Sequence, residues 1–206
     1  MDFTLLKRGV KSKHKLPKNW NQLSLKKYVK IIKSLEDKKE KKEIEKIVDI
    51  ITILSDVPEK DILRLPVKNI NQLGVYLTKF LKTLPEDRLK HILEIKGVEY
   101  GFHPKLSDIT FGEWVDIDAL ITAGANDNLH KIMAVLYRPI IAKSGDKYQI
   151  EPYEPCKDRE QIMLDNLTVG DFYGVSVFFS DLGTELLNHS LTSSIQTLKE
   201  AREEKI

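Results

Sequence analysis

The clearest hydrophobic pattern in the chain lies between residues 110 and 152. Large apolar side chains recur there at intervals of three and four residues, as on one face of an α-helix: Leu129, Ile132, Met133, Leu136 and Tyr137. Asn126 or Asp127 suits the N-cap, and Pro139 is expected to end this helix because proline has no backbone N–H. Upstream, Thr110 and Glu113 have the spacing of a capping box. The pattern predicts a helix pair at the centre of the fold.

Three earlier stripes of helical spacing predict an N-terminal helical layer over residues 22–90. Ser24 is expected to cap the first helix, and Pro58 lies near the first turn of a short one. The apolar positions of the three stripes are Leu25, Tyr28, Ile32 and Leu35, then Ile44, Ile47, Val48, Ile51 and Leu54, then Ile70, Leu73, Leu77, Phe80, Leu81 and Leu84. The charged run over residues 37–46 interleaves Lys with Glu, which favours an exposed helix face over a nucleic-acid patch.

After residue 90 the hydrophobic period changes to two, which predicts strands. Apolar residues alternate on both sides of Lys96-Gly97, a pair suited to a tight turn: Leu93, Ile95, Val98, Tyr100 and Phe102. A second hairpin is expected over 139–152 around Gly145. The expected fold is therefore α+β and mostly helical, with two β-hairpins flanking the central helix pair in an α+β core over 91–187.

A long apolar helix is predicted after Thr168, which has capping-box spacing with Asp171. Apolar side chains lie nearly all round this helix, so we expect it in the core or in a subunit interface. The expected interface residues are Phe172, Val175, Phe178, Phe179, Leu182, Leu186, Leu187, Leu191, Ile195 and Leu198. Residues 188–206 are expected to be a charged helical tail, free or bound to a partner, and 22–187 to form one compact domain.

Charge is distributed unevenly along the 206 residues, although the net charge is only +2. Residues 1–33 hold ten basic residues and one acidic residue, whereas the rest of the chain holds 23 basic and 30 acidic residues. The basic arm over residues 1–21 contains Lys7, Arg8, Lys11, Lys13, Lys15 and Lys18. Three interpretations stay open: the arm binds nucleic acid, binds the acidic body of a neighbouring copy, or is a solvated terminus.

A search for chemistry finds no Gly-rich phosphate loop, H-E-x-x-H or G-x-S-x-G motif, and Cys156 is the single cysteine. The acids Glu113, Asp116 and Asp118 fit helix capping and the helix dipole better than a catalytic cluster. Arg138 is expected to form an ion pair with Glu151 or Glu154. The five histidines, at 14, 91, 103, 130 and 189, show no ligand spacing. We therefore expect no catalytic, metal-binding or cofactor-binding residue, and no apolar run is long enough to span a membrane.

Several segments between residues 16 and 187 resemble a family of structural-region proteins from tailed bacteriophages, including crAss-like and other large phages of Bacteroidetes hosts. These segments are LPKNW, LSLKKY, IKGVEYGF, FGEWVDIDAL, NLHKIMAVLYRPI, YQIEPYE and VGDFYGVSVFFSDLGTELL. The resemblance implies a non-enzymatic virion protein, made in the bacterial cytoplasm and present in many copies in the neck or tail ring or inside the particle. Its partners would be its own copies and other phage structural proteins.

The same resemblance leaves two alternatives open. One is a tail-assembly chaperone that is absent from the mature particle. The other is a DNA-binding accessory of packaging or ejection, which would use the basic arm over residues 1–18. No catalytic residue follows from the resemblance.

Overall fold

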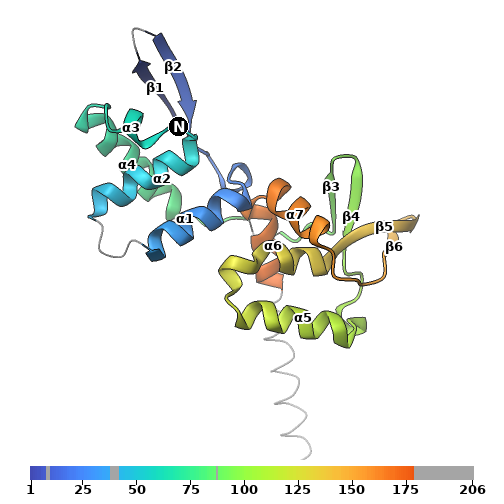
Figure 1. The fold of residues 1–206 in the computed structure, drawn as a ribbon. Coiled ribbons are helices and arrows are strands. Elements are labelled where there is room, and N and C mark those ends of the chain that lie inside the picture. The colour runs from blue at the N-terminus through green and yellow to red at the C-terminus, as the bar shows by residue number, and fades with distance from the viewer. Residues whose placement is uncertain (8–9, 38–41, 87, 179–206) are drawn as a thin grey trace, which may run out of the picture.

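Two buried hydrophobic clusters organise the chain into two lobes, with helix α1 between them (Figure 1). The computed structural model describes residues 1–7, 10–37, 42–86 and 88–178. The change from one cluster to the other falls near residue 90, although Leu25 and Val169 each belong to the cluster of the other lobe. The side chain of Tyr28 packs against both clusters. The described fold is α+β with two antiparallel sheets.

The N-terminal lobe is a layer of helices that carries a β-hairpin. Its elements are β1 (Asp2–Lys7), β2 (Val10–Lys15), the 3-10 turn η1 (Trp20–Gln22), α1 (Leu25–Asp37), α2 (Glu43–Ser55), α3 (Glu59–Ile62) and α4 (Val67–Leu81). Ile51, Ile62 and Leu73 are almost fully buried at its centre. Ser24 Oγ accepts a hydrogen bond from the backbone N–H of Lys27 at 3.3 Å, as expected for the start of α1.

Strands β1 and β2 were not predicted from the sequence, which indicated an arm without a period. They pair antiparallel from Asp2 opposite Lys15 to Lys7 opposite Val10. The signal is weak because the residues of β2 on the same face as the buried Leu5 are Val10, Ser12 and His14, and one apolar residue in three makes no apolar alternation.

The C-terminal lobe combines one sheet with helices α5, α6 and α7 and with a helical segment over residues 169–178. Its elements are β3 (Ile92–Ile95), β4 (Val98–Phe102), the 3-10 turn η2 (Leu106–Asp108), α5 (Phe111–Thr122), α6 (Ala125–Leu136), β5 (Tyr137–Ser144), β6 (Lys147–Ile150) and α7 (Lys157–Asn166). Both predicted hairpins form, and β4 pairs with β5, so the strand order is β3-β4-β5-β6. Lys96 and Gly97 have φ values of 53° and 80°, as a two-residue turn of this kind requires.

The ends of α6 differ from those expected. Gly124, with φ of 111°, precedes the helix, so neither Asn126 nor Asp127 is the N-cap. The helix ends at Leu136, whose carbonyl accepts a hydrogen bond from the N–H of His103 at 2.8 Å. The chain becomes extended at the next residue and enters β5. Pro139 therefore lies inside a strand and is not the residue that ends the helix.

Residues 169–178 are helical and follow the predicted capping box. Asp171 Oδ2 accepts hydrogen bonds from the N–H of Thr168 at 2.9 Å and from its hydroxyl at 2.7 Å. Val175 is buried in the C-terminal cluster, and Phe172 and Phe178 pack against it, so these three serve the core of their own chain. The other expected interface residues lie outside the described residues, as does the expected tail: Phe179, Leu182, Leu186, Leu187, Leu191, Ile195 and Leu198.

Candidate interaction site around helix α5

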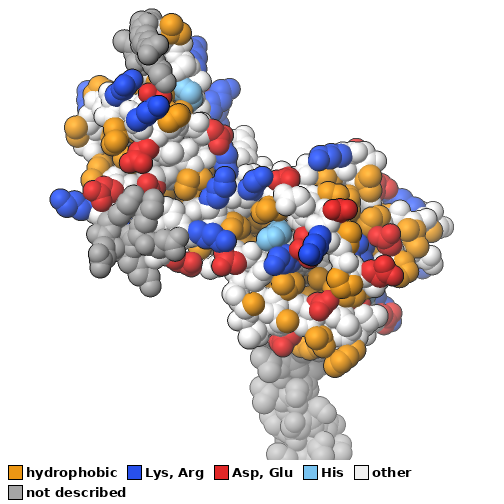
Figure 2. Space-filling view, in the orientation of Figure 1, with side chains coloured by type: hydrophobic (Ala, Val, Ile, Leu, Met, Phe, Trp, Pro, Cys, Tyr) orange, Lys and Arg blue, Asp and Glu red, His pale blue; other side chains and the backbone are white. Residues whose placement is uncertain are grey.

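The outer face of α5 exposes an unusual amount of apolar surface. The exposed fractions are 82% for Phe111, 57% for Trp114, 44% for Val115 and 53% for Ile121. These positions fall on one side of the helix because residues three and four apart in an α-helix are neighbours. Asp118 is also exposed on this side. Figure 2 shows hydrophobic side chains over α5 at the lower edge of the C-terminal lobe. Contiguous exposed apolar surface marks interaction sites in soluble proteins.

The opposite face of α5 is held to the lobe by a buried carboxylate. Glu113 Oε2 accepts hydrogen bonds from the N–H of Thr110 at 2.7 Å and from its hydroxyl at 2.6 Å, which confirms the predicted capping box. Its other oxygen, Oε1, accepts a hydrogen bond from Arg138 Nη2 at 2.5 Å. The side chain of Glu113 is 1% exposed and that of Arg138 is 5% exposed. One ion pair therefore fixes the start of α5 to strand β5.

The partner predicted for Arg138 was wrong. Arg138 lies in β5 and not at a helix end, so it reaches Glu113 across 25 residues of sequence. The neighbourhood of Glu151 and Glu154 is occupied by Arg159 instead. Its Nη2 donates to the carbonyl of Glu154 at 2.6 Å, and its Nη1 lies 3.4 Å from Glu151 Oε2.

Burial determines the electrostatics around this ion pair. It lowers the pKa of the Arg138 guanidinium, and the charge of Glu113 opposes that shift. Burial also lowers the pKa of His103, whose Nε2 lies 3.7 Å from Glu113 Oε1, with Glu113 again acting in the opposite direction. Among the described residues, Arg138 Nε and His103 Nδ1 are buried without a hydrogen-bond partner. A neutral His103 leaves Arg138 as the cation that neutralises Glu113. Removing one partner of such a buried pair is costly, because the other charge is then left buried without a counter-ion.

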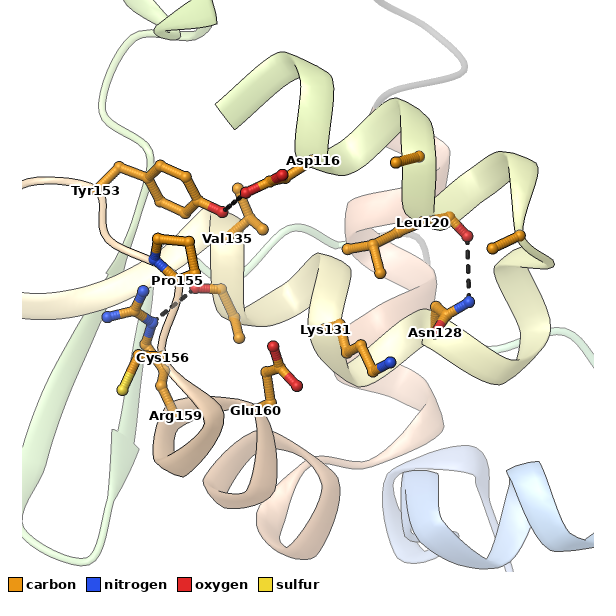
Figure 3. Close-up of a pocket in the computed structure, with 13 residues that line it drawn as sticks. Asp116, Leu120, Asn128, Lys131, Val135, Tyr153, Pro155, Cys156, Arg159 and Glu160 are labelled. Carbon is orange, nitrogen blue, oxygen red and sulfur yellow. Dashed lines mark hydrogen bonds between the residues drawn. The ribbon is translucent and has the colours of Figure 1, made fainter. Parts of the chain in front are cut away.

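A groove of about 460 Å³ lies on the inner side of α5, between α5, α6 and α7 (Figure 3). The Tyr153 hydroxyl donates to Asp116 Oδ2, which ties the segment before α7 to α5. Burial raises the pKa of this phenol, and the hydrogen bond to Asp116 adds to the effect. At the other end of the groove, Asn128 Nδ2 donates to the carbonyls of Leu120 at 3.3 Å and Gly124 at 3.0 Å. These contacts lock the helices around α5 together.

The three acids of α5 have separate roles. Glu113 points inward to Arg138, Asp116 binds Tyr153, and Asp118 is exposed. Cys156 is half-buried and occupies the N-cap position of α7. Within residues 1–7, 10–37, 42–86 and 88–178, no three His, Cys, Asp or Glu side chains gather as metal ligands would. His189 lies outside those residues. Across the same part of the chain, no helix has the length and apolar character needed to span a membrane.

The basic residues of the arm fall on the hairpin and just after it. Lys11, Lys13 and Lys15 are exposed on β2, and Lys18 is exposed beyond it. Lys7 ends β1, and Arg8 lies outside the described residues. This hairpin packs on the N-terminal cluster, whereas α5 packs on the C-terminal cluster, so the two belong to different lobes.

Sequence reasoning missed the outer face of α5. It identified the capped helix but did not separate its inward from its outward residues. A signal was present: large apolar residues occur on several sides of a twelve-residue helix, more than one buried face requires.

Comparisons of the chain with protein-family models, curated proteins and solved structures find no match. The candidate site is therefore defined by its geometry: a capped helix, anchored by a buried ion pair, whose outer apolar face is exposed in the part of the chain that the structure describes.

Proposed function

We propose that this chain is a non-enzymatic structural protein of a tailed-bacteriophage virion, present in many copies in the neck or tail ring or inside the particle. The observation that carries the proposal is the outer face of α5, where Phe111, Trp114, Val115 and Ile121 are exposed together. The resemblance of residues 16–187 to phage structural-region proteins supplies the biological setting.

The rigid mounting of α5 supports a docking role. An interface gains affinity when its residues are already held in the bound arrangement, because less conformational entropy is lost on association. The Glu113–Arg138 pair and the Thr110 cap fix the start of the helix. Trp114 lies one residue after Glu113 on the exposed side, and tryptophan is one of the residue types enriched at interface hot spots.

The proposed occupant of this face is a neighbouring copy of the same chain. An apolar face needs an apolar counterpart, and the segment after residue 178 supplies one in its sequence. Apolar residues recur there at helical spacing: Leu182, Leu186, Leu187, Leu191, Ile195 and Leu198. A contact in which α5 of one copy receives this segment of the next is heterologous, the kind that builds rings.

The test compares two apolar-to-acid substitutions in the full-length protein. Trp114→Asp removes the largest apolar side chain of the face and adds a second carboxylate to that of Asp118, so it should weaken association by about 2 kcal/mol or more, roughly 30-fold. The matched control is Val75→Asp on α4, because Val75 is 57% exposed, as is Trp114. Analytical ultracentrifugation should show oligomers for the wild type and the control, and smaller species for Trp114→Asp with an unchanged circular dichroism spectrum.

Two results would contradict the proposal. A wild-type protein that remains a monomer as its concentration rises would remove self-assembly through α5. If mass spectrometry finds the chain in infected cells but not in purified particles, the virion role is wrong. The chain would then act as an assembly chaperone.

A further inference from the structure

The exposed face of strand β2 carries a regular row of lysines. Lys11, Lys13 and Lys15 are exposed, whereas Ser12 and His14 between them are half-buried. Alternate residues of a strand point to the same side, and they lie about 6.6–6.8 Å apart because the rise is about 3.3–3.4 Å per residue. The three lysine side chains thus leave the same face of one strand.

The hairpin that bears this row is fixed to the N-terminal lobe. Leu5 and Leu16 are buried in the N-terminal cluster. The amino group of Met1 donates to the carbonyl of Leu16 at 3.1 Å and lies 3.2 Å from the Tyr76 hydroxyl, which donates to the carbonyl of Pro17 at 2.7 Å. Figure 1 shows the hairpin extending from this lobe, away from the C-terminal lobe. The lysine row therefore lies on a two-stranded β-ribbon that is attached to the N-terminal lobe at its base and extends from it.

The positive charge of this face is not neutralised within the described residues. Lys11, Lys13, Lys15 and Lys18 form no ion pair there, whereas Lys26, Lys27 and Lys33 on α1 each contact a carboxylate. The acidic residue of the hairpin is Asp2, which stands opposite Lys15 in the register. Thr4 and Leu6 stand opposite Lys13 and Lys11. Three parallel cations with one acid at the end of the row favour a ligand with repeated negative charge.

We propose that the exposed face of β2 binds the phosphate backbone of duplex DNA without sequence preference. A row of evenly spaced ammonium groups matches a linear polyanion whose charges repeat along an extended strand. A two-stranded β-ribbon fits the major groove of B-DNA, and lysines on its face reach the phosphates that border the groove. Lysine acts as a point charge toward phosphate, so such contacts position the protein without reading bases. The proposal does not depend on α5, because the hairpin belongs to the other lobe.

The experiment measures the affinity of the full-length protein for fluorescently labelled duplexes of two unrelated sequences across a salt series. The wild type should bind both alike, and the logarithm of its association constant should fall linearly with the logarithm of salt concentration. The triple variant Lys11→Gln/Lys13→Gln/Lys15→Gln should bind roughly tenfold or more weakly at low salt, and its salt slope should fall by about 2–3, one phosphate contact per lysine.

The matched control removes the same charge from an exposed face of the same lobe: Lys68→Gln/Lys79→Gln/Lys82→Gln, on α4 and at its C-cap. This control should keep the wild-type slope. The proposal is overturned if the wild type does not bind duplex DNA at low salt, or if both triple variants lose affinity equally. It is also overturned if the hairpin variant changes the sedimentation of the protein and not its DNA affinity, because the lysines would then contact an acidic face of a second copy.

Discussion

The outer faces of α5 and of β2 have opposite chemistry. The hairpin buries Leu5 and exposes Lys11, Lys13 and Lys15, the usual arrangement of apolar side chains inside and charge outside. Helix α5 partly reverses it, because it buries the charge of Glu113 and exposes Phe111 and Trp114. The two faces belong to different lobes, and each lobe has its own hydrophobic cluster. The molecule therefore presents two surfaces suited to different partners.

Salt separates the two kinds of contact. Burial of the apolar face of α5 removes nonpolar surface from water, an effect that sulfate or phosphate salts strengthen. The lysine row acts through charges in solvent, and salt screens these over a Debye length of about 8–10 Å at moderate ionic strength. Self-association through α5 should thus persist under conditions that abolish binding through β2.

The largest expected effect on stability comes from removing the cation that neutralises the buried carboxylate of Glu113 in α5. Arg138→Leu leaves Glu113 buried without its cation, and the loss of one partner of a buried ion pair costs about 3–5 kcal/mol. Urea denaturation at neutral pH, followed by circular dichroism, measures this loss as a lower midpoint. The result tests whether the attachment of the inner face of α5 to the lobe depends on the Glu113–Arg138 ion pair, whereas the outer face is proposed to act through apolar surface.

A surface pair in the same lobe provides the control. Lys143 Nζ lies 2.9 Å from Glu99 Oε1, but the two side chains are 43% and 46% exposed, so Lys143→Leu should cost less than about 1 kcal/mol. If Arg138→Leu destabilises the protein no more than Lys143→Leu does, the buried pair does not anchor α5, and the comparison of inner and outer faces fails.

A smaller effect on stability is expected from adding a methyl group at a glycine, and its sign should differ between the packed sheet and the open side of α5. A Cβ atom at Gly101 in β4 would lie 2.4 Å from the ring of Tyr148 and 2.9 Å from Ile150. The ring cannot withdraw freely because its hydroxyl donates to the carbonyl of Phe102 at 2.8 Å. Gly101→Ala should therefore cost about 1–3 kcal/mol through overpacking. Thermal unfolding followed by circular dichroism measures the change.

Gly112 in α5 is the matched position, since a Cβ atom there meets nothing within 4 Å. Gly112→Ala should raise stability by about 0.5–1 kcal/mol, because alanine has the higher helix propensity. Equal effects of the two substitutions would mean that β4 is not packed against Tyr148 as the structure indicates.

The elements of this fold were predictable where one face of an element carries the apolar residues. The stripe from Leu129 to Leu136 predicted α6, and the alternation around Lys96-Gly97 predicted the first hairpin. The hairpin β1–β2 was missed because β2 places the polar Ser12 and His14 on its inner side, and Val10, its one apolar residue, is exposed. Pattern reasoning finds a strand from its buried apolar residues, and β2 has none between residues 10 and 15.

The candidate sites were harder to predict because they depend on contacts between distant segments. Glu113 and Arg138 meet only after β5 is paired with β4 and α5 is packed beside them. Neither the strand register nor the helix packing can be predicted from the hydrophobic pattern of the sequence. The capping role of Glu113 was predictable because it is local. Which side of an apolar helix faces solvent depends on its neighbours. The exposure of Phe111 and Trp114 therefore required the structure.

The smallest expected effect is a pH dependence that arises beside the buried pair. Burial lowers the pKa of His103 below its ordinary value of 6.5; Glu113 and Asp108 oppose that shift, and Arg138 adds to it. As pH falls below 6.5, the unfolded chain therefore binds a proton before the folded chain does, and stability decreases. The contribution of His103 to stability is complete above pH 6.5. It decreases as the pH falls toward the lowered pKa of the folded state, and it levels off below that pKa. Thermal unfolding between about pH 7 and about pH 5 should show a decrease of roughly a few degrees in Tm.

His103→Gln isolates the contribution of this residue from that of other titrating groups. Burial also lowers the pKa of His130, which lies on α6 away from Glu113, so the variant should keep part of the pH dependence. The difference between wild type and variant reports only the imidazole that faces the Glu113–Arg138 pair. If the Tm of the wild type changes over this pH range by the same amount as that of His103→Gln, folding does not lower the pKa of His103. Burial on the inner side of α5 would then not outweigh the charge of Glu113 at His103.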